Sequence, residues 1–98
     1  MSNLVFVVIA TKGDYSDRTE WPVMVVASKE RAEELVKQYD RERDEWIATV
    51  EVEKDYETIV MPFPWARGME IMFHDKDERI YPYGDRVTFY YSEALSEV

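Results

Sequence analysis

Hydrophobic residues form two continuous runs near the N-terminus, separated by a polar segment. Residues 4–10 (LVFVVIA) and 23–27 (VMVVA) are apolar and rich in β-branched side chains. Residues 11–20 between them gather Gly, Asp and Ser, which favour turns. We therefore predict two strands joined as a long hairpin. Because the first run has no polar alternation, it is expected to be central in its sheet and buried on both faces.

A spacing of three and four residues follows Ser28. The apolar positions at this spacing are Ala32, Leu35, Val36, Tyr39, Trp46 and Ile47, with Arg43 on the same stripe. The pattern predicts an amphipathic helix from residue 29 to about residue 46. Ser28 stands at the N-cap position, where its hydroxyl can accept from the amide of Glu30 or Arg31. No Gly or Pro marks the end of this helix.

After Thr49 the period changes to two. Val50, Val52 and Tyr56 alternate with four acidic residues, Glu51, Glu53, Asp55 and Glu57. This alternation predicts a half-exposed strand whose outer face is acidic. Residues 61–68 (MPFPWARG) predict a connection because they contain two prolines and a glycine, with Phe63 and Trp65 folded back on the core.

The C-terminal third predicts further strands. Residues 69–74 and 79–81 flank a polar turn as a hairpin, and residues 86–91 have strong β propensity. Residues 92–98 are expected to form one helical turn or to fray. The fold class is therefore α+β in a single domain, residues 1–98. It has one antiparallel sheet of five or six strands and one main helix packed on one face, in β-β-α-β-β-β order.

Composition excludes several kinds of chemistry. The 98 residues include no cysteine, so disulfides, thiolate metal sites and a cysteine nucleophile are ruled out. His74 is the one histidine, which argues against a Ser-His-Asp triad and a multi-histidine metal site. Asp75, Asp77 and Glu78 lack the order and the glycine of a calcium loop. We expect no metal, no cofactor and no enzymatic activity.

Acidic residues outnumber basic ones by 21 to 12, for a net charge of -9. The chain should repel nucleic acid and anionic membranes, because binding either depends on Lys and Arg. On a strand, alternate acids would lie about 6.6 Å apart, close to two steps of the roughly 3.4 Å phosphate spacing of DNA. We therefore predict a surface that binds a partner with a basic groove, formed by Glu42, Asp44, Glu45, Glu51, Glu53, Asp55 and Glu57. The alternative is a solvated edge strand whose charges prevent aggregation.

The first 40 residues or so resemble a known group of sequences. The N-terminal strand, the loop GDYSD at residues 13–17, the strand VMVVAS and the helix start SKERAEELV are similar to small uncharacterised proteins common in bacteriophage and bacterial genomes. The resemblance implies a fold and no established activity. Small size, acidity and missing catalytic groups are also similar in style to phage anti-defence inhibitors, including anti-CRISPR proteins and DNA mimics.

We accordingly expect a non-catalytic inhibitor in the cytoplasm of a bacterial host, which binds a basic surface of a host nuclease or CRISPR effector. Two alternatives stay open. One is a structural or accessory module that homodimerises through an open sheet face, because a single helix covers only one face. The other is an enzyme or small-ligand domain that uses carboxylates around Trp65 and Tyr83.

Overall fold

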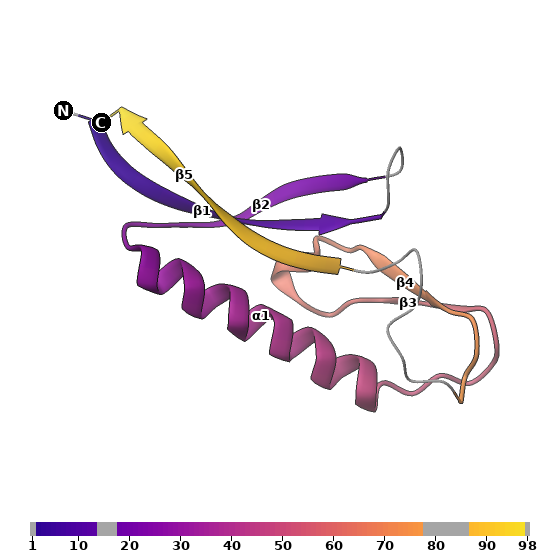
Figure 1. The fold of residues 1–98 in the computed structure, drawn as a ribbon. Coiled ribbons are helices and arrows are strands. Elements are labelled where there is room, and N and C mark those ends of the chain that lie inside the picture. The colour runs from indigo at the N-terminus through magenta and orange to yellow at the C-terminus, as the bar shows by residue number, and fades with distance from the viewer. Residues whose placement is uncertain (1, 14–17, 78–86, 98) are drawn as a thin grey trace.

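The computed structural model describes residues 2–13, 18–77 and 87–97, which form one α-helix and five strands in two antiparallel sheets (Figure 1). The elements are β1 (Ser2–Lys12), β2 (Thr19–Val26), α1 (Lys29–Thr49), β3 (Glu57–Val60), the 3₁₀ turn η2 (Pro64–Ala66), β4 (Glu70–Phe73) and β5 (Val87–Glu97). The α+β class and the β-β-α-β-β-β order are confirmed. The prediction of a single sheet is wrong, because the strands form two sheets, β2-β1-β5 and β3-β4.

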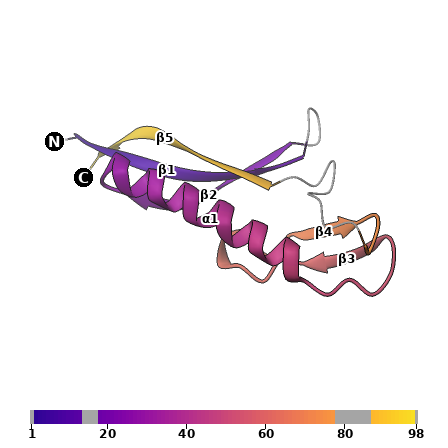
Figure 2. The same ribbon diagram turned by 60° about the horizontal axis from the view of Figure 1, so that its bottom comes forward.

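β1 is central in the larger sheet, as predicted, and pairs antiparallel with β2 and β5. Phe6, Val8 and Ala10 are buried on the face that α1 covers. Val5 and Val7, which alternate with them, are only partly buried. Figure 2 shows α1 lying along one face of this sheet and no helix on the other. The expectation that β1 is buried on both faces is therefore wrong.

β5 continues almost to the C-terminus. It pairs with β1 along its whole length, from Lys12 opposite Val87 to Ser2 opposite Glu97. The predicted helical turn or frayed end over residues 92–98 is wrong for residues 92–97, because this segment pairs with β1, which is distant in the sequence. β4 pairs with β3. The predicted strand at 79–81 lies outside the described residues.

α1 begins as its sequence indicates and ends later. The Ser28 hydroxyl accepts from the Arg31 amide at 3.1 Å, one of the two predicted capping bonds. The helix then runs to Thr49, nearly a turn beyond the predicted end. Val50 ends it in an extended conformation and donates its N–H to the Trp46 carbonyl at 2.7 Å.

Removing this cap should weaken the helix measurably. We expect Ser28→Ala to lower the free energy of unfolding by about 1 kcal/mol, because the first-turn amide of Arg31 loses its acceptor. Urea denaturation followed by circular dichroism measures this. Ser28→Asp keeps an acceptor at the cap and should remain within about 0.5 kcal/mol of the wild type. Equal losses in the two variants would show that the cap contributes nothing.

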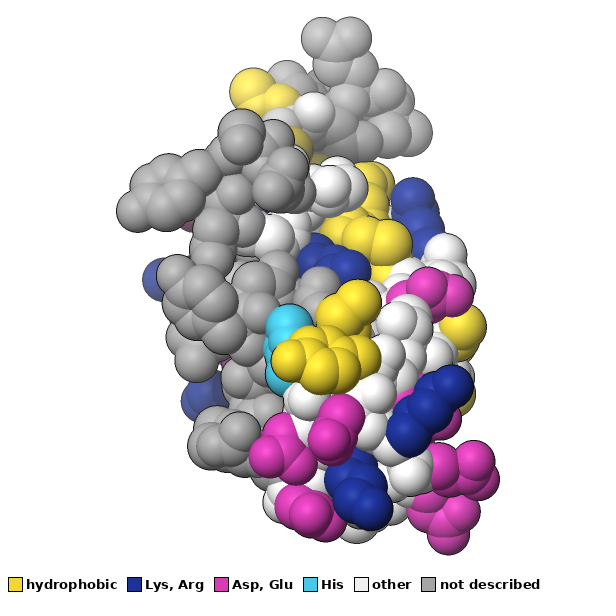
Figure 3. Space-filling view, turned by 90° about the vertical axis from the view of Figure 1, so that its right-hand side faces the viewer, with side chains coloured by type: hydrophobic (Ala, Val, Ile, Leu, Met, Phe, Trp, Pro, Cys, Tyr) yellow, Lys and Arg dark blue, Asp and Glu magenta, His cyan; other side chains and the backbone are white. Residues whose placement is uncertain are grey.

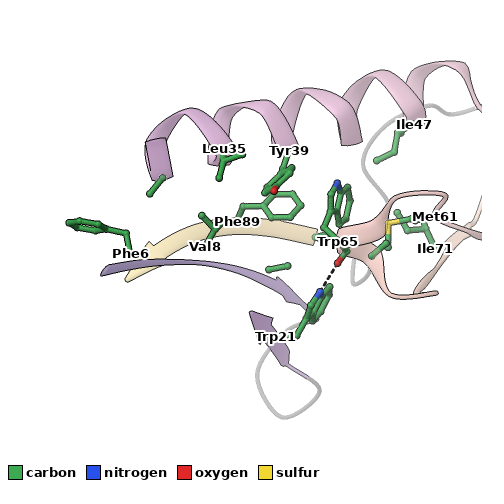
Figure 4. Packing of buried hydrophobic residues seen from close by; sticks show 14 of the residues in the cluster. Phe6, Val8, Trp21, Leu35, Tyr39, Ile47, Met61, Trp65, Ile71 and Phe89 are labelled. Atoms are coloured by element: carbon green, nitrogen blue, oxygen red, sulfur yellow. Dashed lines mark hydrogen bonds between the residues drawn. The ribbon is translucent and has the colours of Figure 1, made fainter. Parts of the chain in front are cut away.

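A buried cluster joins the two sheets, and Trp65 lies at their junction (Figure 4). Its carbonyl accepts from the indole N–H of Trp21 in β2 at 2.6 Å, and its ring stacks on Phe63 at 4.8 Å. Phe89 of β5 packs against the same ring in a T-shaped arrangement, also at 4.8 Å. The prediction that Phe63 and Trp65 fold back onto the core is confirmed.

The molecule is extended. Its radius of gyration is 15.4 Å, whereas a compact domain of about 100 residues has roughly 13 Å. The two-stranded sheet lies beyond one end of the three-stranded sheet, beside the C-terminal half of α1 (Figures 1 and 2). It does not cover the face of the three-stranded sheet that is opposite α1. The open face of the three-stranded sheet therefore keeps exposed apolar residues such as Val25, which is 58% exposed.

Candidate functional site

The predicted acidic strand does not form. Residues 50–53 are irregular, residues 54–56 form a bend and turn, and only Glu57 belongs to β3. The acidic residues therefore do not alternate along a strand, and their carboxylates do not have the regular spacing that was compared with the phosphates of DNA. We call residues 51–57 the acidic turn.

Two carboxylates of the acidic turn hold its backbone. Glu57 accepts from the Glu53 amide at 3.0 Å, and Asp55 accepts from the Lys76 amide at 3.0 Å, which ties the turn to the loop after β4. Glu51 and Glu53 are exposed. No side-chain hydrogen bond of either carboxylate to another described residue is found. Two acids thus shape the turn, and two face solvent.

Tyr56 stands at the tip of the turn in an unusual backbone conformation. Its φ is 60°, in the left-handed region that a bulky side chain rarely adopts. Its side chain is 69% exposed and contacts the His74 ring edge-on at 5.7 Å. The strained backbone is therefore not offset by burial of the ring. Its effect is to present an aromatic ring to solvent.

The surroundings of Tyr56 are negatively charged. Residues 51–57 contain four acids and one lysine, and residues 75–77 contain two acids and one lysine, so the two segments carry -3 and -1, or -4 together. None of the four acids in the turn forms an ion pair with a described Lys or Arg. Figure 3 shows this end of the molecule, with the cyan histidine beside an exposed hydrophobic patch and acidic side chains gathered below, a few basic ones among them.

The helical acids of the predicted set do not join this surface as a group. Glu42 is partly buried and accepts from the Gln38 amide and from the Trp65 indole N–H, both at 3.2 Å. Asp44 forms an ion pair with Arg43 at 2.9 Å. Glu45 is exposed near the C-terminus of α1. The sequence reasoning missed both Tyr56, because nothing in the sequence indicates its positive φ, and the structural role of Glu42.

Three tyrosines are electrostatically coupled to acids. Burial, with the Glu42 carboxylate, raises the pKa of Tyr39 above its ordinary value. The hydrogen bond that Tyr90 donates to Glu20 raises the pKa of Tyr90. Burial, and then the bond to Glu33, raises the pKa of Tyr91. All three hydroxyls are therefore protonated at neutral pH, and those of Tyr90 and Tyr91 donate to Glu20 and Glu33.

Among the described residues, no group of three or more His, Asp or Glu side chains is placed to hold a metal ion. Within the same part of the chain, no helix combines the length and the apolar character that crossing a bilayer requires. Comparison of the chain with protein-family models, with curated proteins and with solved structures gave no match.

Proposed function

We propose that this protein is a non-catalytic inhibitor that binds a basic, nucleic-acid-binding host protein through the acidic turn. The observation that carries the proposal is Tyr56, an exposed ring held at φ 60° among carboxylates that form no ion pair with a described Lys or Arg. A left-handed non-glycine residue costs about 1–3 kcal/mol, and such strain concentrates at functional positions. Tyrosine is also enriched among the residues that dominate binding energy at protein interfaces.

The electrostatics of this end favour a basic partner. α1 has no basic residue in its last turn, so the helix itself supplies no cation to compensate the negative end of its dipole. Glu45 and the acidic turn add further negative charge at the same end. A basic surface would relieve this repulsion, and long-range attraction would speed association and make it dependent on salt.

The class of partner is part of the proposal. A surface that attracts a concentrated negative charge is typical of proteins that neutralise phosphates with Lys and Arg. A nuclease or CRISPR effector of a bacterial host fits that description. The similarity in style to phage anti-defence inhibitors supports this choice, and inhibition would follow from occupation of the groove that takes nucleic acid.

The experiment is a two-stage binding test. The protein is used to capture partners from a bacterial lysate at low and high salt, and captured proteins are identified by mass spectrometry. The proposal expects a basic nucleic-acid-binding protein that is retained less at high salt. Affinity for this protein is then measured for Glu51→Lys with Glu53→Lys, and for Tyr56→Asn. These changes spare the two carboxylates that shape the turn, and Asn tolerates a positive φ.

The matched control is Glu70→Lys with Glu93→Lys, two exposed acids outside the acidic turn. Both double variants change the net charge equally, from -9 to -5, since each adds four units. We expect each acidic-turn variant to weaken binding by at least about tenfold and the control by less than about threefold. Equal losses in control and test variants would mean that only total charge matters, and the proposed surface would be wrong.

A second candidate rests on the open sheet face. On this face Val25 of β2 is 58% exposed and lies opposite Val7 of β1, which is only partly buried, and Tyr90 of β5 is exposed as well. Exposed apolar residues at this density favour a homodimeric structural module in which a second copy covers the sheet. Sedimentation equilibrium at micromolar concentration distinguishes the two. A species at the 11.7 kDa chain mass contradicts the dimer.

A further inference from the structure

A cleft of about 330 Å³ opens where β2, α1 and η2 meet. This volume is at the lower end of the range for small-molecule sites, roughly 300–1,000 Å³. The cleft is distinct from the acidic turn. Its walls carry one carboxylate from α1 and one guanidinium from the residue that follows η2, and most of the other lining residues are apolar.

Glu42 forms the negative pole of the cleft. The Gln38 amide donates to one of its carboxylate oxygens and the Trp65 indole N–H donates to the other, so its position is fixed from two sides. Each carboxylate oxygen can accept two hydrogen bonds, so each keeps one free position. No described Lys or Arg forms an ion pair with Glu42. A partly buried, oriented and unpaired carboxylate can thus accept from a cationic ligand.

Arg67 forms the positive pole. It follows η2 with φ 49°, a left-handed conformation. One Nη2 hydrogen bond goes to the Pro22 carbonyl at 2.9 Å and anchors the guanidinium beside β2. A guanidinium has five N–H donors, so several remain available. No described Asp or Glu pairs with Arg67, and no ion pair joins it to Glu42 across the cleft.

The wall that β2 contributes to the cleft is apolar. The register of β2 on β1 shifts between Val8 and Ile9, so that Val8 lies opposite Met24 and Ile9 opposite Pro22. Val23 is the extra residue of this bulge, and both Val23 and Met24 line the cleft. Bulges redirect side chains in this way and are frequent beside functional sites. Met24 is 45% exposed and its unbranched side chain adapts to different shapes.

From these features we infer that the cleft binds a small zwitterion, an α-amino acid with an apolar side chain. Its ammonium group would donate to Glu42, its carboxylate would accept from Arg67, and its side chain would pack on Met24. A bare cation would be repelled by Arg67, and a bare anion by Glu42. The inference is independent of the proposed protein-binding function, because it uses neither Tyr56 nor the acidic turn.

The test uses the whole protein labelled with ¹⁵N and titrated with each of the common L-amino acids, and with two analogues of leucine. Leucinamide lacks the carboxylate, and 4-methylpentanoate lacks the ammonium group. We expect at least one apolar amino acid to bind with a Kd of about 1 mM or tighter and to shift the amide resonances of Met24, Glu42 and Arg67. An analogue of the bound amino acid that lacks either the carboxylate or the ammonium group, as these two do for leucine, should bind at least about tenfold more weakly.

Variants separate the two poles. Glu42→Gln and Arg67→Met should each weaken binding by about tenfold or more, and Glu42→Gln should abolish the preference over the analogue without an ammonium group. If Glu42→Gln disturbs Trp65 and the fold, Arg67→Met still tests the inference, because Arg67 is exposed and its replacement should leave the fold intact. Glu51→Lys with Glu53→Lys should bind the amino acid normally. The inference is overturned if no amino acid shifts these resonances, or if an analogue with one charge binds equally well.

Discussion

Replacing Trp65 with alanine should remove much of the stability of the protein. The side chain is 4% exposed and packs between Phe63 and Phe89. Truncation of a buried aromatic residue to alanine costs about 3–5 kcal/mol. A chain of this length has a total unfolding free energy of roughly 5–15 kcal/mol. We therefore expect a fall of more than about 1 M in the urea midpoint, measured by circular dichroism.

Trp65→Phe is the matched control. It keeps an aromatic ring against Phe63 and Phe89 and removes the N–H that donates to Glu42. Its loss should be smaller, about 1–2 kcal/mol, because a hydrogen bond to a charged group is removed and most of the packing stays. If alanine were tolerated as well as phenylalanine, Trp65 would not be the residue that joins the two sheets.

The N-terminal half of the fold could be predicted because its signals are local. Two apolar runs around a turn-rich segment define the hairpin, and Ser28 with the stripe after it defines the start of α1. The end of α1 was missed because Val50 stops the helix by turning extended, without the glycine or proline that would mark the position. Local chemistry places an N-cap better than it places an uncapped C-terminus.

The errors in the C-terminal half have non-local causes. Alternation over residues 50–57 predicted a strand, yet no other strand pairs with residues 50–56 within the described chain, and the Glu57 carboxylate binds the Glu53 amide instead. Residues 92–97 were expected to fray because nothing nearby in the sequence stabilises them. They form a strand because β1, more than 80 positions earlier in the chain, provides the partner.

The candidate sites depended on the same distinction. The acids of the turn could be chosen from the sequence as a charged group, while the conformation that presents Tyr56 could not. Carboxylates around Trp65 were considered for a small-ligand site, and the structure brings Glu42 to Trp65 across 23 positions. Tyr83, the other residue of that expectation, lies outside the described residues. Arg67 carried no signal, because its role depends on the left-handed turn after η2.

Arg43 is the second residue whose replacement should have a large effect, since a charged side chain on the apolar stripe of α1 needs partners. It is 11% exposed and donates to Asp40 at 2.7 Å and to the Val87 carbonyl of β5 at 2.8 Å. Arg43→Met keeps the aliphatic stem and removes these charge-assisted bonds. We expect a loss of about 2–3 kcal/mol in the free energy of unfolding, measured by urea denaturation.

The control for this prediction is an arginine on the same helix whose ion pair is exposed. Arg31 pairs with Glu34 at 3.1 Å, and both side chains are more than half exposed, at 53% and 67%. Arg31→Met should therefore cost no more than about 0.5 kcal/mol, and raised salt should reduce even that. The loss from Arg43→Met should persist at about 1 M salt, because partly buried pairs are screened much less. Equal, salt-sensitive losses at the two positions would mean that Arg43 is an ordinary surface charge, and that α1 is held on β5 by its apolar contacts alone.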